Sequence, residues 1–146
     1  MTINIAIADD HPVVLHGLAA LISSDPEFVV VAQCQNGVAA LTAIRDLKPD
    51  LAILDLNMPG LNGIETVRRA RERWPGLRVL YVTGYADAAS TGLQTDDDPL
   101  IRKPFRLSEL TAEVNRALER NRYAGRHNVV PLGRGSRKRR KVRDGR

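Results

Sequence analysis

The sequence predicts an α/β fold in which a central five-stranded parallel sheet is doubly wound by helices. Along residues 1–122, short apolar runs alternate five times with segments of helical periodicity, each unit about as long as a right-handed crossover requires. Residues 51–55 are apolar up to a single aspartate, which is typical of a parallel strand covered on both faces. Pro59 and Gly60 then stop the strand. A chain of 146 residues is long enough for one domain with a real core, but not for two ordinary ones.

The order of the predicted elements indicates the flavodoxin-like type of this fold, (βα)5. The apolar runs that predict strands are residues 3–8, 28–32, 51–55, 77–82 and 100–102. The segments that predict helices are residues 12–22, 37–47, 62–73, 86–94 and 108–118. Pro12 suits a first helical turn, where its missing N–H is not needed, and Asn62 is expected to cap the third helix. No glycine-rich phosphate loop follows the first strand, which argues against a Rossmann or P-loop nucleotide site.

Charge is unevenly distributed along the chain. Residues 1–120 have twelve basic and sixteen acidic side chains, whereas residues 121–146 have ten Lys or Arg and one Asp, and helical periodicity is lost from residue 121 onward. We therefore expect a mildly acidic domain over residues 1–122 and a basic, disordered tail over residues 123–146. The sequence has no membrane-spanning apolar run and no signal-peptide pattern, which predicts a cytoplasmic protein without a membrane partner. It has one cysteine, so no internal disulfide is expected.

Polar side chains follow four of the predicted strands at their carboxyl ends. They are Asp9 and Asp10, Asp55, Thr83 and Lys103. Because the carboxyl ends of parallel strands lie along one edge of the sheet, we expect these groups to share a shallow pocket. Two carboxylates about 4 Å apart repel by roughly 4 kcal/mol at an effective dielectric near 20, and one lysine cannot offset three of them. A divalent cation is implied, and an all-oxygen site with room for water fits Mg²⁺ better than Zn²⁺.

Over about residues 1–120 the chain resembles the receiver (REC) domain of two-component response regulators. The matching segments are Asp9-Asp10, Asp55-Leu-Asn-Met-Pro-Gly, Thr83-Gly84 and Lys103-Pro104-Phe105, each following a predicted strand. Any one of these motifs is common, but all four in order make the resemblance specific. The segments Thr83-Gly-Tyr-Ala and Leu100-Ile-Arg-Lys-Pro-Phe are also similar to receivers attached to hybrid sensor kinases.

The resemblance implies a phosphoacceptor in a His-Asp phosphorelay, which catalyses its own phosphoryl transfer and dephosphorylation and is not otherwise an enzyme. Asp55 would take a phosphoryl group from a sensor histidine kinase or a histidine phosphotransfer protein. The implied Mg²⁺ ligands are Asp9, Asp10, Asp55 and the backbone carbonyl of Asn57. Lys103 would pair with the phosphoryl group, and the Thr83 hydroxyl would hydrogen-bond to it and report the modification to the helix that follows.

Three positions would modulate such a switch. Leu100 stands where many receivers have a Tyr or Phe that turns inward on activation, which puts the usual coupled switch in question. Tyr85 could screen an acyl phosphate from water, whereas Asn57 could orient an attacking water, and the two effects oppose one another. The segment between Thr83 and Lys103 is also short for the family. Because that surface commonly carries receiver dimerisation, a homodimer is left open.

Three functions compete for this sequence. The first is a stand-alone receiver that signals by protein contact or serves as a phosphate relay, without a DNA-binding output domain. Residues 123–146 cannot fold into such a domain, so either the receiver acts alone or the chain is a piece of something longer. The second is a nucleic-acid-binding regulator that acts through the basic tail, although the tail lacks interleaved aromatics for base stacking. The third is a phosphatase of the haloacid dehalogenase type, which would need an Asp where this chain has Asn57. His11 and His16 are interpreted as neither metal ligands nor phosphodonors.

Overall fold

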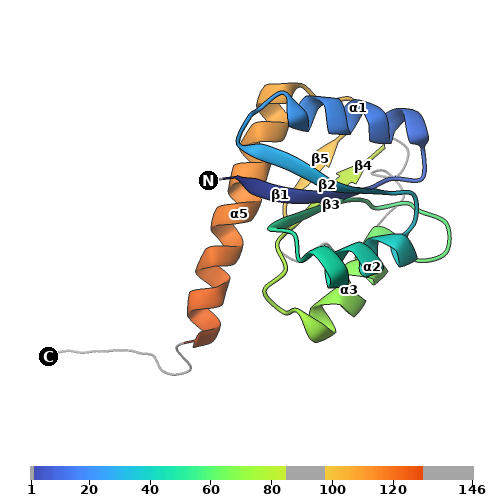
Figure 1. Ribbon diagram of the computed structural model, residues 1–146. Helices are drawn as coiled ribbons and strands as arrows, with labels where there is room; N and C mark the ends of the chain where they lie inside the picture. The colour runs from blue at the N-terminus through green and yellow to red at the C-terminus, as the bar shows by residue number, and fades with distance from the viewer. Residues whose placement is uncertain (1, 85–97, 130–146) are drawn as a thin grey trace, which may run out of the picture.

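A computed structural model of the protein describes residues 2–84 and 98–129, and in it five parallel strands form one sheet with the order β2-β1-β3-β4-β5 (Figure 1). The strands are β1 (Ile3–Ala8), β2 (Phe28–Cys34), β3 (Leu51–Asp55), β4 (Val79–Thr83) and β5 (Leu100–Arg102). The helices are α1 (Pro12–Ser23), α2 (Gly37–Leu47), α3 (Gly63–Arg73) and α5 (Leu107–Val129). This strand order confirms the predicted flavodoxin-like, doubly wound sheet. The helix predicted over residues 86–94 and the position of Tyr85 lie outside the described residues.

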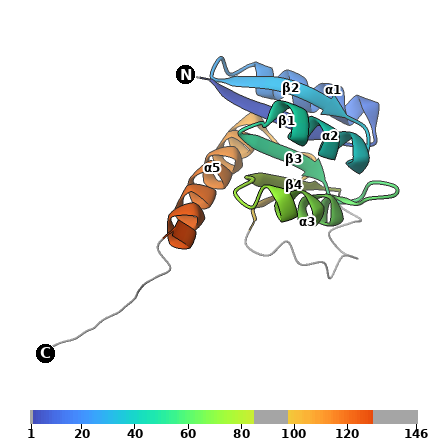
Figure 2. The same ribbon diagram turned by 60° about the horizontal axis from the view of Figure 1, so that its bottom comes forward.

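Helices cover both faces of the sheet, with α1 and α5 on one side and α2 and α3 on the other (Figures 1 and 2). Successive strand residues point to opposite faces, so each strand contributes to two separate apolar cores. On β3, Ile53 packs in the core beneath α1 and α5, while its neighbour Leu54 packs beneath α2 and α3. Every residue of β3 is buried, as the sequence predicted for a strand covered on both faces.

Side-chain caps fix the starts of two helices. The Asn62 Oδ1 atom accepts a hydrogen bond of 2.8 Å from the Glu65 backbone N–H, which confirms the cap predicted for α3. Asn36 caps α2 in the same way, through a bond of 2.7 Å from the Ala39 N–H. Pro12 lies in the first turn of α1, as predicted. These caps fix where the chain leaves the sheet edge that carries the polar residues.

The connection from β3 to α3 depends on Gly63. A Cβ atom at this position would lie 2.5 Å from the Asp55 carbonyl oxygen and 3.1 Å from the Leu56 Cα, and both are backbone atoms. The Gly63 N–H also donates to the Leu56 carbonyl at 3.0 Å. The absence of a side chain therefore lets α3 begin in contact with the end of β3, immediately beside Asp55.

Three boundaries differ from the sequence expectations. The second strand continues to Cys34 and the fourth begins at Val79, because pairing with the neighbouring strand decides where each ladder ends. The last helix is longer than expected and continues to Val129, so the predicted boundary after residue 122 falls inside α5 (Figure 1). Elongation of a formed helix costs little, and no proline interrupts residues 107–130.

The basic segment over residues 130–146, predicted to be disordered, lies outside the described residues. Among the residues that are described, no helix combines the length and the apolar character needed to cross a bilayer.

Candidate functional site

The polar residues that follow the strands meet at one edge of the sheet. Ala8 of β1 is in register with Leu54 of β3, so Asp9 and Asp55 are neighbours across the sheet. Asp55 is in register with Val82 of β4, and Lys103 donates its backbone N–H to the Thr83 carbonyl at 2.9 Å. Parallel pairing thus brings together the strand ends that the sequence predicted to converge.

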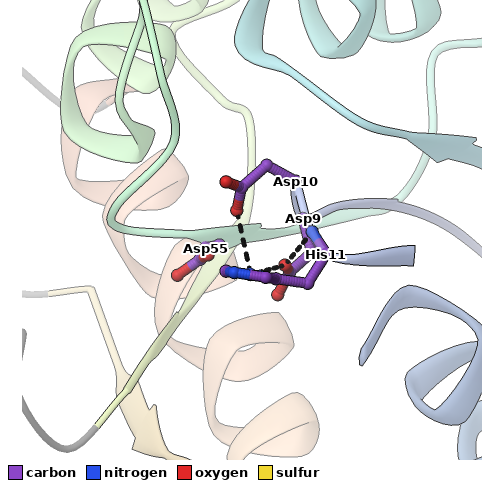
Figure 3. A group of neighbouring side chains, drawn as sticks. All are labelled: Asp9, Asp10, His11 and Asp55. Atoms are coloured by element: carbon purple, nitrogen blue, oxygen red, sulfur yellow. Dashed lines mark hydrogen bonds and ion pairs between the residues drawn. The ribbon is translucent and has the colours of Figure 1, made fainter. Parts of the chain in front are cut away.

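Three carboxylates form the centre of this site. Asp9 is 1% exposed, Asp55 is 2% exposed and Asp10 lies nearer the surface, at 24%. One donor atom from each of these residues, together with one from His11, lies within 4.8 Å of all the others (Figure 3). Burial of several like charges at this distance costs free energy unless a cation compensates them.

Lys103 supplies part of that compensation. Its Nζ atom lies 2.8 Å from Asp9 Oδ2 and 3.7 Å from Asp55 Oδ2. The ammonium group therefore forms a direct ion pair with Asp9 and a longer one with Asp55. A single positive charge is shared between two buried carboxylates, and Asp10 has no contact with it among the ion pairs of the described residues.

The Asp55 carboxyl group is the most perturbed acid of the site. Burial, and after it the negative charge of Asp9, raise the pKa of Asp55 to about 6. Lys103 and a hydrogen bond from the Asn57 backbone N–H, 3.3 Å from Asp55 Oδ1, act in the opposite direction. An acid with this balance loses its proton more readily when another cation enters the site.

Thr83 is fully buried at the end of β4, and its hydroxyl donates to the Gly84 carbonyl at 3.2 Å. The predicted contact with a phosphoryl group would require the hydroxyl to leave this partner. Leu100 is exposed on β5 and stands in register with Tyr81, whose side chain is buried. At this level of the sheet the aromatic side chain is therefore Tyr81 on β4, and not the residue at position 100 on β5.

His11 belongs to the group, although its sequence context predicted neither a metal ligand nor a phosphodonor. Its Nδ1 atom lies 3.3 Å from Asp9 Oδ1 and 3.2 Å from Asp10 Oδ1, and its backbone N–H donates to Asp9 Oδ1 at 2.9 Å. The available signal was its position, directly after the two aspartates and before the proline that starts α1. A residue in this turn between β1 and α1 lies at the edge of the sheet that carries the aspartates. His16, by contrast, lies on the exposed side of α1, outside the cluster.

The donor set fits a hard divalent cation. Within the described part of the chain, Asp10 Oδ1 is buried and accepts no hydrogen bond, and only the His11 ring approaches it. Asp55 Oδ2 has Lys103 at 3.7 Å, too far for a hydrogen bond. Several carboxylate oxygens at this edge of the sheet thus have unused lone pairs. Mg²⁺ accepts such ligands while it keeps several of its waters.

Comparison with known families agrees with this geometry, because the model of the response regulator receiver domain matches residues 5–115. The chain belongs to the receiver family. Receivers are signalling domains of two-component response regulators; they interact with histidine kinases or phosphotransfer proteins and generally bind Mg²⁺ at an acidic pocket. The match removes support for the haloacid dehalogenase interpretation.

Curated relatives of this receiver include response regulators, one of which is described as DNA-binding. The nitrate/nitrite response regulator protein NarL of Escherichia coli is 34% identical over 116 residues, which cover 78% of this chain and 54% of NarL. The DNA-binding response regulator MtrA of Mycolicibacterium smegmatis is 36% identical over 120 residues, which cover 81% of this chain and 51% of MtrA. The receiver chain thus spans about half the length of these relatives.

Solved structures of receivers have the same fold. The REC domain of AraT, a response regulator from Geobacillus stearothermophilus, superposes with a TM-score of 0.73 at 25% identity and covers 86% of this chain and 99% of that domain. A LuxR-family two-component response regulator from Aurantimonas sp. gives a TM-score of 0.69 at 30% identity and covers 82% of this chain and 86% of that one.

Proposed function

We propose that this receiver is a Mg²⁺-dependent phosphoacceptor, modified on Asp55 by a sensor histidine kinase or a histidine phosphotransfer protein. The observation that carries the proposal is the environment of Asp55. This carboxylate is 2% exposed at the end of β3, it faces Asp9 and Asp10, and the Lys103 ammonium lies 3.7 Å away. An aspartate that served only as a turn residue would be exposed to solvent, and it would not lie among other carboxylates and a lysine.

The chemistry requires little covalent work from the protein. An Asp55 oxygen attacks the phosphorus of a phosphohistidine, the P–N bond breaks, and the imidazole leaves with the bonding electron pair. Asp9, Asp10, Asp55 and the Asn57 carbonyl would hold Mg²⁺, which would supply positive charge against the phosphoryl oxygens. Lys103 has a flexible stem and can exchange its contact with Asp9 for one with the phosphoryl group.

The proposed output is a change at the end of β4. A phosphoryl group adds a charge of about −1.5 to −2 beside Thr83, whose hydroxyl donates to the Gly84 carbonyl in the structure. Transfer of that hydrogen bond to a phosphoryl oxygen would release Gly84 and alter the segment that follows β4. Signalling then proceeds by contact of this surface with a partner protein.

Phosphorylation with a small donor tests the proposal directly. The protein is incubated with acetyl phosphate or phosphoramidate and Mg²⁺, and its intact mass is measured. We expect one labile phosphate, released by alkali or hydroxylamine, on the wild type, none on Asp55→Asn, and none on the wild type in EDTA. Asp50→Asn is the matched control, because Asp50 lies just before β3 and accepts a hydrogen bond from the Asn4 N–H, away from the site. A phosphate retained by Asp55→Asn would refute the assignment.

The basic tail supports a second candidate function, regulated binding to nucleic acid. Residues 130–146 contain eight Lys or Arg and one Asp, and a relative, MtrA, is described as DNA-binding. Truncation after Val129 leaves α5 whole and removes this charge. Under this second function, truncation abolishes binding to duplex DNA in an anisotropy assay and removes a steep salt dependence, while labelling of Asp55 is unchanged. Equal DNA binding by the whole chain and the truncated chain would exclude the tail as the DNA-binding segment.

A further inference from the structure

The turn from β1 to α1 places an imidazole at the mouth of the acidic site. His11 is 66% exposed, but its ring contacts two carboxylates, since Nδ1 lies 3.2 Å from Asp10 Oδ1 and 3.3 Å from Asp9 Oδ1 (Figure 3). Lys103 contacts the other oxygen of Asp9, Oδ2. Lys103 and the His11 ring therefore contact different oxygens of the Asp9 carboxylate, and the ring lies on the side that faces Asp10.

The spacing of these atoms matches one coordination sphere. In an octahedral site with metal–ligand distances of about 2.1–2.2 Å, adjacent donors are about 3 Å apart and opposite donors a little over 4 Å. The two contacts of Nδ1 are close to the adjacent spacing, and one ligand atom from each of Asp9, Asp10, His11 and Asp55 lies within 4.8 Å of the others. Small shifts of an exposed ring would bring Nδ1 and the carboxylate oxygens onto a single cation.

Divalent cations differ in how they would use such a ring. Mg²⁺ prefers oxygen ligands and retains its waters, so an imidazole adds little to its binding. Ni²⁺ and Zn²⁺ favour imidazole nitrogen, and Mn²⁺, although oxygen ligands suit it, accepts an imidazole more readily than Mg²⁺ does. A histidine in this position therefore separates the two classes of metal.

We propose that His11 is a metal-selectivity residue, whose Nδ1 atom coordinates a first-row transition-metal ion held by Asp10 and Asp55, whereas Mg²⁺ is held there by oxygens alone. This inference rests on the proposed function, because it uses the same metal site. It adds a transition metal as a second kind of cofactor for the receiver. It also gives the ring a role that its contacts with two carboxylates support.

Pulsed electron paramagnetic resonance of bound Mn²⁺ tests the ligand itself. The whole chain is prepared with natural or ¹⁵N-labelled histidine, loaded with Mn²⁺ alone, and compared with His11→Ala and His16→Ala. The matched control is His16, an exposed histidine of α1, the helix that His11 precedes. We expect a histidine nitrogen coupling that changes with the label, is lost in His11→Ala and is retained in His16→Ala. The labelling comparison uses only the wild type, so it decides the question even if a variant does not fold.

Binding constants supply the second measurement. Titration of Mn²⁺, with Mg²⁺ added in competition, should show a loss of Mn²⁺ affinity of about tenfold in His11→Ala, with Mg²⁺ affinity nearly unchanged. Bound Mn²⁺ without histidine coupling, or an equal effect on both metals, would overturn the role of His11 and leave the phosphoacceptor proposal intact. Failure of the wild type to bind either metal would overturn both.

Discussion

Asp55 is a buried acid whose charged form is poorly compensated when no metal is present. Burial and the nearby charge of Asp9 raise its pKa to about 6, above the ordinary value near 4. The folded state therefore binds a proton at Asp55 more tightly than the unfolded state does. Stability from this group is fully present below about pH 4 and is lost as the pH rises through about 6.

Asp55→Asn should stabilise the metal-free protein at neutral pH, because it removes the ionised group and keeps the shape of the side chain. The difference in pKa corresponds to at most about 3 kcal/mol at pH 7.5 and to little near pH 4. Urea unfolding in EDTA at both pH values measures it, with Asp50→Asn as the control. A variant less stable than the wild type at pH 7.5 would contradict this account of Asp55.

Most of the site was predictable at the level of single residues, because Asp9, Asp10, Asp55 and Lys103 each follow a predicted strand. His11 was not, since a histidine at a helix start has no pattern of its own and its role depends on where the turn carries the ring. The hydrogen bond from the Thr83 hydroxyl to the Gly84 carbonyl was equally unpredictable, because it depends on the rotamer of Thr83 and not on sequence spacing.

At the scale of elements, the buried strand β3 was easier to predict than the end of α5. The buried run of β3 is recognisable because parallel strands covered on both faces are apolar throughout. The end of α5 has no such signal. Residues 121–129 lack an apolar stripe, yet they continue the helix because nothing in them blocks its hydrogen bonds.

The junction of β3 and α3 gives a prediction at this scale. Gly63→Ala places a Cβ atom 2.5 Å from the Asp55 carbonyl oxygen, and backbone has to move to relieve the contact. We expect a loss of about 1–3 kcal/mol in stability and slower labelling of Asp55 by acetyl phosphate, because the phosphoacceptor loop shifts with the helix. Denaturant unfolding and a time course of intact mass measure the two effects.

Gly17→Ala is the matched control for that experiment. Gly17 lies within α1, and a Cβ atom there would meet nothing within 4 Å. Alanine is the better helix former by about 1 kcal/mol, so this variant should be more stable than the wild type and should be labelled at the same rate. Equal effects of the two substitutions would show that helix propensity, and not contact with Asp55, determines the result.

At the scale of the whole molecule, the sheet brings four separate strand ends to one edge, so the site exists only in the folded chain. A cation that binds this site therefore stabilises the fold by mass action, by about 1.4 kcal/mol at ten times its dissociation constant. The same cation competes with the proton on Asp55, whose pKa is raised to about 6. Folding, metal binding and proton release are consequently linked through one carboxyl group.

Mg²⁺ should thus raise the melting temperature at pH 7.5 and raise it much less at pH 5, where Asp55 is mostly protonated in the metal-free fold. Below about pH 6 the apparent affinity should fall by up to about tenfold for each pH unit, since one proton must leave for each metal bound. Calorimetric scans over a Mg²⁺ series at both pH values measure this, and Asp55→Asn should show a smaller Mg²⁺ response with little change between them. A wild-type shift of the same size at pH 5 and pH 7.5 would mean that the metal binds without Asp55, at a site other than the end of β3.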